Sequence, residues 1–163
     1  MERFDVAIVG GGPAGSAAAH AAASAGASAV VLEKGVPRSD RPDRLGPDST
    51  DAAGILDYWV DIMGTHPDEM PDDVVLGTLD RAEFVGPTES LTMRSTGIDS
   101  SYDNFGFCMH RARFDDFLRD RAVDAVATYR VGTSVPGVET ALGASHQPRH
   151  RLELAGEEDV GAG

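Results

Sequence analysis

The sequence predicts an α/β fold built around one βαβ unit, and three observations near the N-terminus carry that prediction. A short apolar run, Phe4–Val9, leads into the glycine-rich turn GGGPAG. An alanine-rich segment, Ser16–Ala25, follows and stops at Gly26, which is a typical end for a helix. A second apolar run, Ser28–Glu33 (SAVVLE), comes next. Short apolar runs bounded by glycine are typical of buried parallel strands, so the order is strand, helix, strand.

The turn between the first strand and the helix carries glycine with the spacing Gly10-x-Gly12-x-x-Gly15. In a Rossmann-like fold, the first glycine permits the tight turn and the second lets a pyrophosphate reach the backbone. The third lets the helix lie close to the strand. Glu33 ends the second strand about 20 residues later, where a carboxylate accepts hydrogen bonds from ribose hydroxyls. The pattern therefore predicts a dinucleotide-binding site on this turn.

The rest of the chain is expected to contain shorter elements and two long loops. Residues 35–47 and the acidic stretch His66–Asp73 are predicted loops. Apolar residues at helical spacing predict helices over Thr50–Met63, with Trp59 as a core anchor, and over Phe114–Ala127. Strands are expected at the following positions: Arg81–Val85, Ser90–Thr96, Gly106–His110, Thr128–Val131, Val135–Thr140 and Arg151–Leu154.

The composition limits the classes of partner and compartment. The net charge is −13, which disfavours nucleic acid and anionic membrane surfaces held by charge alone. Lys34 is the one lysine, and this acidic, lysine-poor composition fits either a halophilic source or a GC-rich genome. Cys108 is the one cysteine, so no disulfide can form within the chain. With no apolar run long enough to span a membrane and no signal peptide, we expect a cytoplasmic protein.

The segments GGGPAGSAAA and VVLEK resemble the N-terminal FAD-binding motif of two-domain flavoproteins. That group includes para-hydroxybenzoate hydroxylase and the geranylgeranyl reductases. The resemblance implies that FAD is the cofactor and that it contacts this set of residues: Gly10, Gly12, Pro13, Ala14, Gly15, Glu33 and Lys34.

A second segment, Phe105–Glu139, is similar to the Arg-x-x-Phe-Asp-x-x-Leu region of the geranylgeranyl reductases. By this resemblance Arg111 contacts FAD, although an ion pair with Asp115 one turn later is the alternative. Val135 is expected to offer backbone contacts near the adenine. Arg44 and Leu45 fall where the family's loop after the second strand meets the cofactor. The chain lacks a cysteine-glycine pair often found in that loop.

The family's later Gly-Asp motif, which binds the ribityl chain and flavin, has no counterpart before Gly163. We therefore expect residues 1–163 to be the N-terminal part of an FAD-binding domain, truncated at its C-terminus. Residues 36–110 are expected to form a loop and strand insertion. No catalytic residue is assigned, and no metal site is expected, because prolines scatter the acidic groups around His66.

The resemblance implies an FAD-dependent oxidoreductase of the geranylgeranyl reductase type that reduces an isoprenoid or similar apolar substrate. The expected partners are that small molecule and a reductant such as NAD(P)H, with peripheral membrane association compatible with a lipid substrate. Two alternatives stay open. The first is an FAD-dependent monooxygenase of the hydroxylase type, which shares this N-terminal architecture. The second is a non-catalytic dinucleotide-binding fragment.

Overall fold

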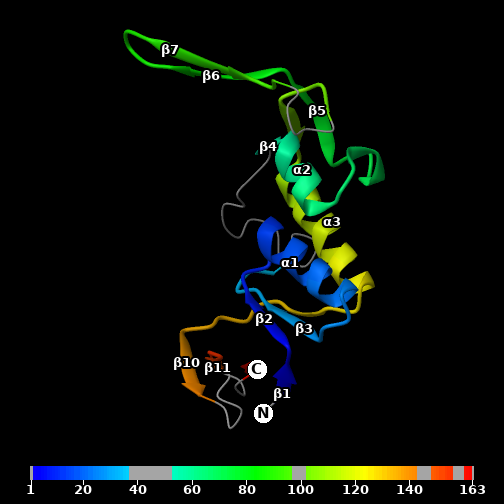
Figure 1. The fold of residues 1–163 in the computed structure, drawn as a ribbon, viewed down its shortest axis with the longest axis vertical. Coiled ribbons are helices and arrows are strands. Elements are labelled where there is room, and N and C mark those ends of the chain that lie inside the picture. The colour runs from blue at the N-terminus through cyan, green and yellow to red at the C-terminus, as the bar shows by residue number, and fades with distance from the viewer. Residues whose placement is uncertain (1, 37–52, 97–101, 143–147, 156–159, 163) are drawn as a thin grey trace. The chain divides into compact units, whose positions relative to one another are not determined.

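The structure is a computed structural model that describes residues 2–36, 53–96, 102–142, 148–155 and 160–162. The chain forms two compact units (Figure 1). Unit 1 consists of residues 1–45 and 118–163, and unit 2 consists of residues 46–117.

Unit 1 is organised around a three-stranded parallel sheet in the order β2-β3-β9. The strands are β2 (Val6–Val9), β3 (Ala29–Leu32) and β9 (Thr128–Arg130). Helix α1 (Pro13–Ser24) connects β2 to β3, and helix α3 (Arg111–Asp124) precedes β9. Every residue of β3 is buried, as expected for the central strand of a parallel sheet. The βαβ unit predicted from the sequence is present.

Alternate residues of β3 face two separate apolar clusters. Ala29 and Val31 pack with Ala19 of α1 and with Ala122 and Ala127. Val30 and Leu32 pack on the opposite face with Leu152 and Leu154. This alternation follows from the two-residue period of a strand, which sends successive side chains to opposite faces. The alanines of α1 allow the helix to lie close to the sheet, because they place little side-chain volume between the two.

A second sheet in unit 1 has the order β1-β12-β11-β10. Its strands are β1 (Glu2–Phe4), β10 (Gly137–Leu142), β11 (Pro148–Glu153) and β12 (Val160–Ala162). At the start of β2, the backbone N–H and the hydroxyl of Ser28 both donate to the Asp5 carboxylate, at 2.8 and 2.7 Å. These two bonds hold the pKa of Asp5 below its ordinary value. They also join Asp5, which lies between β1 and β2, to Ser28, the residue that precedes β3.

Unit 2 contains a three-stranded antiparallel sheet in the order β4-β8-β5. The strands are β4 (Ala53–Leu56), β5 (Val75–Leu79) and β8 (Gly106–Met109). Helix α2 (Asp57–Met63) follows β4 directly and ends at Gly64, which has a left-handed conformation. A 3-10 helix, η2 (Pro67–Glu69), lies within the predicted acidic loop. Val60, Met70, Val74, Phe107, Met109 and Phe114 are buried in this unit.

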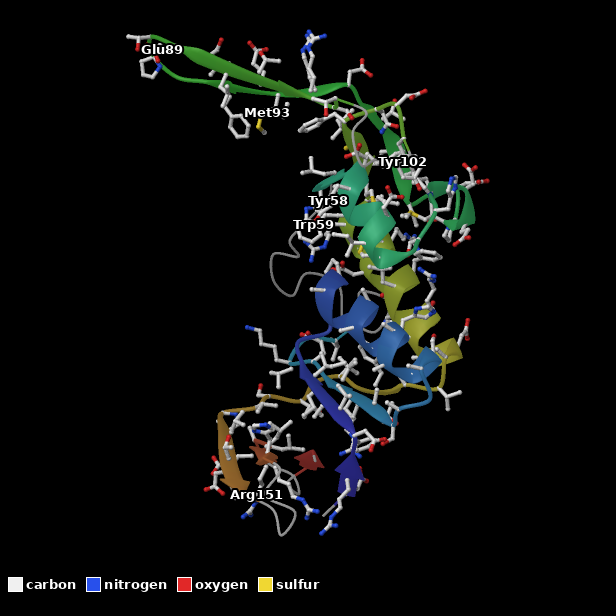
Figure 2. All side chains as sticks on the ribbon, viewed as in Figure 1. Tyr58, Trp59, Glu89, Met93, Tyr102 and Arg151 are labelled. Atoms are coloured by element: carbon white, nitrogen blue, oxygen red, sulfur yellow. The ribbon has the colours of Figure 1, made fainter. Side chains whose placement is uncertain are left out.

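Strands β6 (Arg81–Val85) and β7 (Ser90–Arg94) form an antiparallel hairpin that pairs with no other described strand (Figure 1). Phe84 lies opposite Leu91, and Ala82 lies opposite Met93. Since cross-strand partners share a face, these four side chains make one apolar face. Phe84 and Leu91 are 59% and 60% exposed, and Met93 is labelled on this hairpin in Figure 2.

One predicted element is wrong in its type. The segment Thr50–Met63 was expected to be one helix, but Ala53–Leu56 is strand β4 and the helix begins at Asp57. The reason is non-local: Ile55 and Leu56 pair with Phe107 and Gly106 of β8, and those backbone bonds replace helical ones. The prediction of Trp59 as a core anchor is also wrong, because its side chain is 50% exposed.

Candidate cofactor-binding site

The glycine-rich turn joins β2 to α1 and includes one residue that needs glycine for its backbone. Gly10 has φ of 102°, a conformation that L side chains rarely adopt. Its N–H donates to the carbonyl of Leu32 at 2.9 Å, which fixes the turn to the end of β3. A Cβ at Gly10 would meet no atom within 4 Å, so the space beside this residue is open.

Gly15 needs glycine for a different reason, which is the close approach of α1 to the turn. A Cβ at Gly15 would overlap the carbonyl oxygen of Gly10 and lie 3.3 Å from Cγ2 of Ile8. Both atoms belong to the strand and turn that precede the helix. Any side chain at position 15 therefore forces the helix away from the turn.

The N-terminus of α1 has no side-chain cap. Gly12 is the N-cap residue in an extended conformation, and Pro13 occupies the first turn without an N–H group. The first backbone bond of the helix runs from the N–H of Ser16 to the carbonyl of Gly12 at 2.9 Å. The N–H groups of Ala14 and Gly15 lie within the first turn, where a helix carries partial positive charge. An uncapped glycine turn of this kind fits a phosphate-bearing cofactor.

Glu33 follows β3 and ties two parts of the site together. Its Oε2 accepts a hydrogen bond from the N–H of Gly11, and its Oε1 accepts one from the N–H of Gly35, both at 2.6 Å. Each carboxylate oxygen has two lone pairs, so a hydroxyl donor from a ribose can still bind. The side chain thus shapes the turn and keeps acceptor capacity for a ligand.

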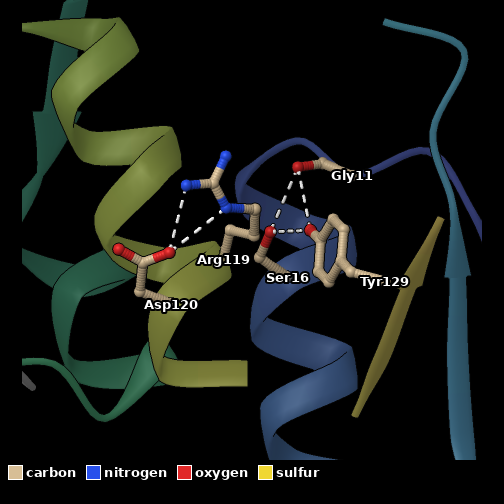
Figure 3. A network of polar contacts seen from close by, with 5 residues as sticks. All are labelled: Gly11, Ser16, Arg119, Asp120 and Tyr129. Atoms are coloured by element: carbon tan, nitrogen blue, oxygen red, sulfur yellow. Dashed lines mark hydrogen bonds and ion pairs between the residues drawn. The ribbon is translucent and has the colours of Figure 1, made fainter. Parts of the chain in front are cut away.

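Sequence reasoning missed a cluster of two hydroxyls around Gly11 (Figure 3). The Ser16 hydroxyl lies 3.1 Å from the carbonyl oxygen of Gly11 and 2.5 Å from the Tyr129 hydroxyl. The Tyr129 hydroxyl lies 3.2 Å from the same carbonyl. The signal in the sequence was Gly11, the middle one of three consecutive glycines, because the fingerprint spacing does not require glycine there.

The structure brings only part of the predicted set together. Lys34 is exposed directly after Glu33. Val135 packs against the apolar cluster of Val30 and Leu32, and its loop reaches the site because the N–H of Thr133 donates to the carbonyl of Glu33 at 2.9 Å. These residues and the glycine turn all belong to unit 1.

The remaining predicted contacts are Arg111, Arg44 and Leu45. Arg111 belongs to unit 2, where its Nε donates to the Asp115 carboxylate at 2.8 Å, the ion pair considered as its alternative role. A contact between Arg111 and the cofactor stays a prediction. Arg44 and Leu45 lie outside the described residues. Within the described part of the chain, no group of three or more His, Cys, Asp or Glu side chains is arranged to hold a metal ion.

Among the helices of the described residues, none has the length and apolar character needed to cross a bilayer.

Comparison with known proteins agrees with the fold and the glycine turn. The family model described as the FAD binding domain matches residues 5–82. The chain is 30% identical over 141 residues to the "Uncharacterized protein in nifH2 5'region" of Methanosarcina barkeri, covering 83% of this chain and 69% of that protein. It is 30% identical over 158 residues to the digeranylgeranylglycerophospholipid reductase of Thermoplasma acidophilum, covering 94% of this chain and 37% of the reductase.

A solved structure gives the same result. The crystal structure of a geranylgeranyl bacteriochlorophyll reductase-like protein from Thermoplasma acidophilum superimposes with a TM-score of 0.66 at 26% identity. That match covers 99% of this chain and 37% of the other. The fold and the glycine turn thus define an FAD-binding flavoprotein domain of mixed α/β type.

Within that class the chain can be placed further. It belongs to the same family as the Methanosarcina barkeri protein, of which it covers 69%, and it is similar to geranylgeranyl reductase-type proteins over most of its own length. The chain spans about a third of the length of the named reductases that it matches, with 32% and 37% of the two Thermoplasma proteins covered.

Proposed function

We propose that this chain supplies the ADP-binding part of an FAD-dependent reductase that acts on an isoprenoid or similar apolar substrate. The observation that carries the proposal is the uncapped glycine turn of α1 beside Glu33, in a chain whose relatives include digeranylgeranylglycerophospholipid reductases. NAD(P)H is the proposed reductant.

In this proposal different site residues contact different parts of the ADP half of FAD. Gly12, Ala14 and Gly15 offer backbone N–H groups to the pyrophosphate, and Pro13 shapes the first turn of α1. Glu33 accepts hydrogen bonds from the adenosine ribose. Lys34 and the loop that contains Val135 border the adenosine. Arg111, Arg44 and Leu45 are proposed as further contacts of the cofactor.

When bound, FAD supplies the redox chemistry through its isoalloxazine ring, and the chain contributes binding and orientation. A hydroxylase-type monooxygenase is the less supported alternative, because three relatives at 30–33% identity are named as reductases.

The test is calorimetry of the purified chain with FAD, ADP and NADP. FAD and ADP should bind more tightly than NADP, because the Glu33 carboxylate repels a 2′-phosphate. Gly12→Val places a branched side chain where the pyrophosphate approaches, so it should abolish binding of FAD and ADP.

Gly77→Val is the matched control, because a Cβ there meets no atom within 4 Å and the residue lies in β5 of unit 2. It should bind ADP as the parent does. NADP binding as tight as ADP binding, or an unchanged affinity in Gly12→Val, would contradict the proposal.

A further inference from the structure

Gly11 is held on both sides of its backbone by three side chains. Its N–H donates to Glu33, and its carbonyl lies within hydrogen-bond distance of the hydroxyls of Ser16 and Tyr129. A Cβ at Gly11 would lie 3.0 Å from the Glu33 Cβ, the Tyr129 Cε1 and the Tyr129 hydroxyl. The side of Gly11 that faces the protein is therefore filled by Tyr129 and Glu33.

The two hydroxyls share a limited number of protons. Ser16 and Tyr129 each carry one hydroxyl proton, yet three short oxygen–oxygen distances join them to each other and to the Gly11 carbonyl. One hydroxyl must therefore donate to the other, which in turn donates to the carbonyl. Either hydroxyl alone can still donate to Gly11, so the two are redundant as donors.

Fixing the Gly11 carbonyl also fixes the next N–H group. The peptide bond between Gly11 and Gly12 is trans and planar, so its carbonyl and its N–H point in opposite directions. With the carbonyl turned toward Ser16 and Tyr129, the Gly12 N–H points away from them. Ser16 is fully buried, which keeps water from replacing its hydroxyl in this contact.

We propose that Tyr129 and Ser16 are positioning residues for the cofactor, because together they aim the Gly12 N–H at its pyrophosphate. They act through the Gly11 carbonyl and touch no phosphate themselves. Tyr129 comes from β9, the third strand of the sheet, so formation of the site depends on a strand far from the glycine turn in the sequence. This inference rests on binding of the cofactor at the glycine turn.

The test compares Ser16→Ala, Tyr129→Phe and the double variant in binding to ADP and to adenosine. Each single variant should bind ADP within about two- to three-fold of the parent, because the other hydroxyl still donates to Gly11. The double variant should lose roughly ten-fold, since that is the usual weight of one hydrogen bond. Its affinity for adenosine should stay that of the parent, because adenosine has no pyrophosphate.

The matched control is Ser24→Ala with Tyr58→Phe, two exposed positions on α1 and α2. This pair should change neither affinity. Equal loss of ADP and adenosine in the Ser16/Tyr129 double variant, or no loss of ADP, would overturn the proposal. A parent chain that fails to bind ADP would instead overturn the cofactor site itself.

If the double variant does not fold, Gly11→Ala combined with Ser16→Ala decides the question. The added methyl group displaces the Tyr129 hydroxyl from the Gly11 carbonyl, and Ser16→Ala removes the other donor, so ADP should bind about ten-fold more weakly while the affinity for adenosine changes less. Parent-like ADP affinity in this variant would overturn the proposal.

Discussion

The two units of this chain differ sharply in charge. Unit 1 contains 12 acidic and 10 basic residues, for a net charge of −2, whereas unit 2 contains 15 acidic and 4 basic residues, for a net charge of −11. Most of the net charge of −13 therefore belongs to the unit that lacks the glycine turn. The unit that carries the turn is close to neutral.

This difference shows that a total charge is a poor guide to which ligands a chain accepts. A net charge of −13 argues against anionic partners when it is treated as uniform. FAD carries an anionic pyrophosphate, and its proposed site lies in the unit whose charges nearly balance, where helix α1 offers uncapped N–H groups. Charges in unit 2 that lie beyond a Debye length of about 10 Å are largely screened at 0.1 M salt.

The largest expected effect comes from a pair of Gly→Ala substitutions, one in each unit. A Cβ at Gly15 would overlap the Gly10 carbonyl oxygen in unit 1, and a Cβ at Gly106 would overlap the Ile55 carbonyl oxygen in unit 2. Gly15→Ala should weaken ADP binding by at least a hundred-fold, because α1 must leave the turn. Gly106→Ala should disturb the pairing of β4 with β8 and keep ADP binding.

Two measurements separate these outcomes. Calorimetry with ADP reports on unit 1, and the fluorescence of Trp59, the one tryptophan, reports on unit 2. Loss of ADP binding in both variants would contradict this expectation, because a substitution in unit 2 would then also disrupt the site in unit 1.

A smaller effect is expected from salt, and it should be concentrated in unit 2. Repulsion among the carboxylates of unit 2 weakens its fold in dilute buffer, and potassium chloride screens that repulsion. The unfolding midpoint followed by Trp59 fluorescence should rise by several degrees, roughly 1 kcal/mol, between 10 mM and 1 M KCl. Sucrose of equal osmolarity is the control for effects other than screening. A midpoint that stays flat or falls in KCl would count against repulsion as the cause.

The smallest effect is expected from uncharged substitutions at two helix ends of unit 1, which leave the net charge of that unit unchanged. Helices α1 and α3 end in the same way. After α1, the N–H groups of Gly26 and Ala27 donate to the carbonyls of Ala23 and Ala22. After α3, the N–H groups of Val126 and Ala127 donate to the carbonyls of Val123 and Ala122. Gly26 has φ of 85° and Val126 has φ of 73°. Valine is strained in this left-handed conformation, and its side chain here is 86% exposed. Val126→Gly should therefore raise the free energy of unfolding by about 1 kcal/mol in urea denaturation.

The reciprocal change, Gly26→Val, should lower that free energy by a similar amount. No gain in Val126→Gly, together with no loss in Gly26→Val, would mean that these helix ends relax without strain.

The sequence was most informative where the structure depends on neighbouring residues. The β2-α1-β3 unit was predictable because its glycines, alanines and apolar runs lie within one stretch of chain. Strand β4 was not, because the apolar spacing around Ile55 and Leu56 also fits a helix, and the β8 residues that pair with β4 are 50 or more positions away. Strand β5, with alternating burial over Val75–Leu79, was missed altogether.

The same limit applies to the site. The roles of Gly10 and Gly15 follow from local backbone geometry. The contact of Tyr129 with Ser16 joins residues 113 positions apart, and no local pattern marks a tyrosine on β9 as part of the glycine turn.

The β6–β7 hairpin has a consequence for how copies of this molecule behave in solution. A two-stranded ribbon that exposes Phe84 and Leu91 on one face and pairs with no other described strand is a template for self-association. Two copies that meet through their hairpins also bring together two units of net charge −11, and this repulsion keeps them apart at low ionic strength. Salt screens this repulsion between molecules, and it also screens the repulsion among carboxylates within each molecule. High salt therefore stabilises the folded molecule, and at the same salt concentration its solubility depends most on whether the apolar face of the hairpin is covered.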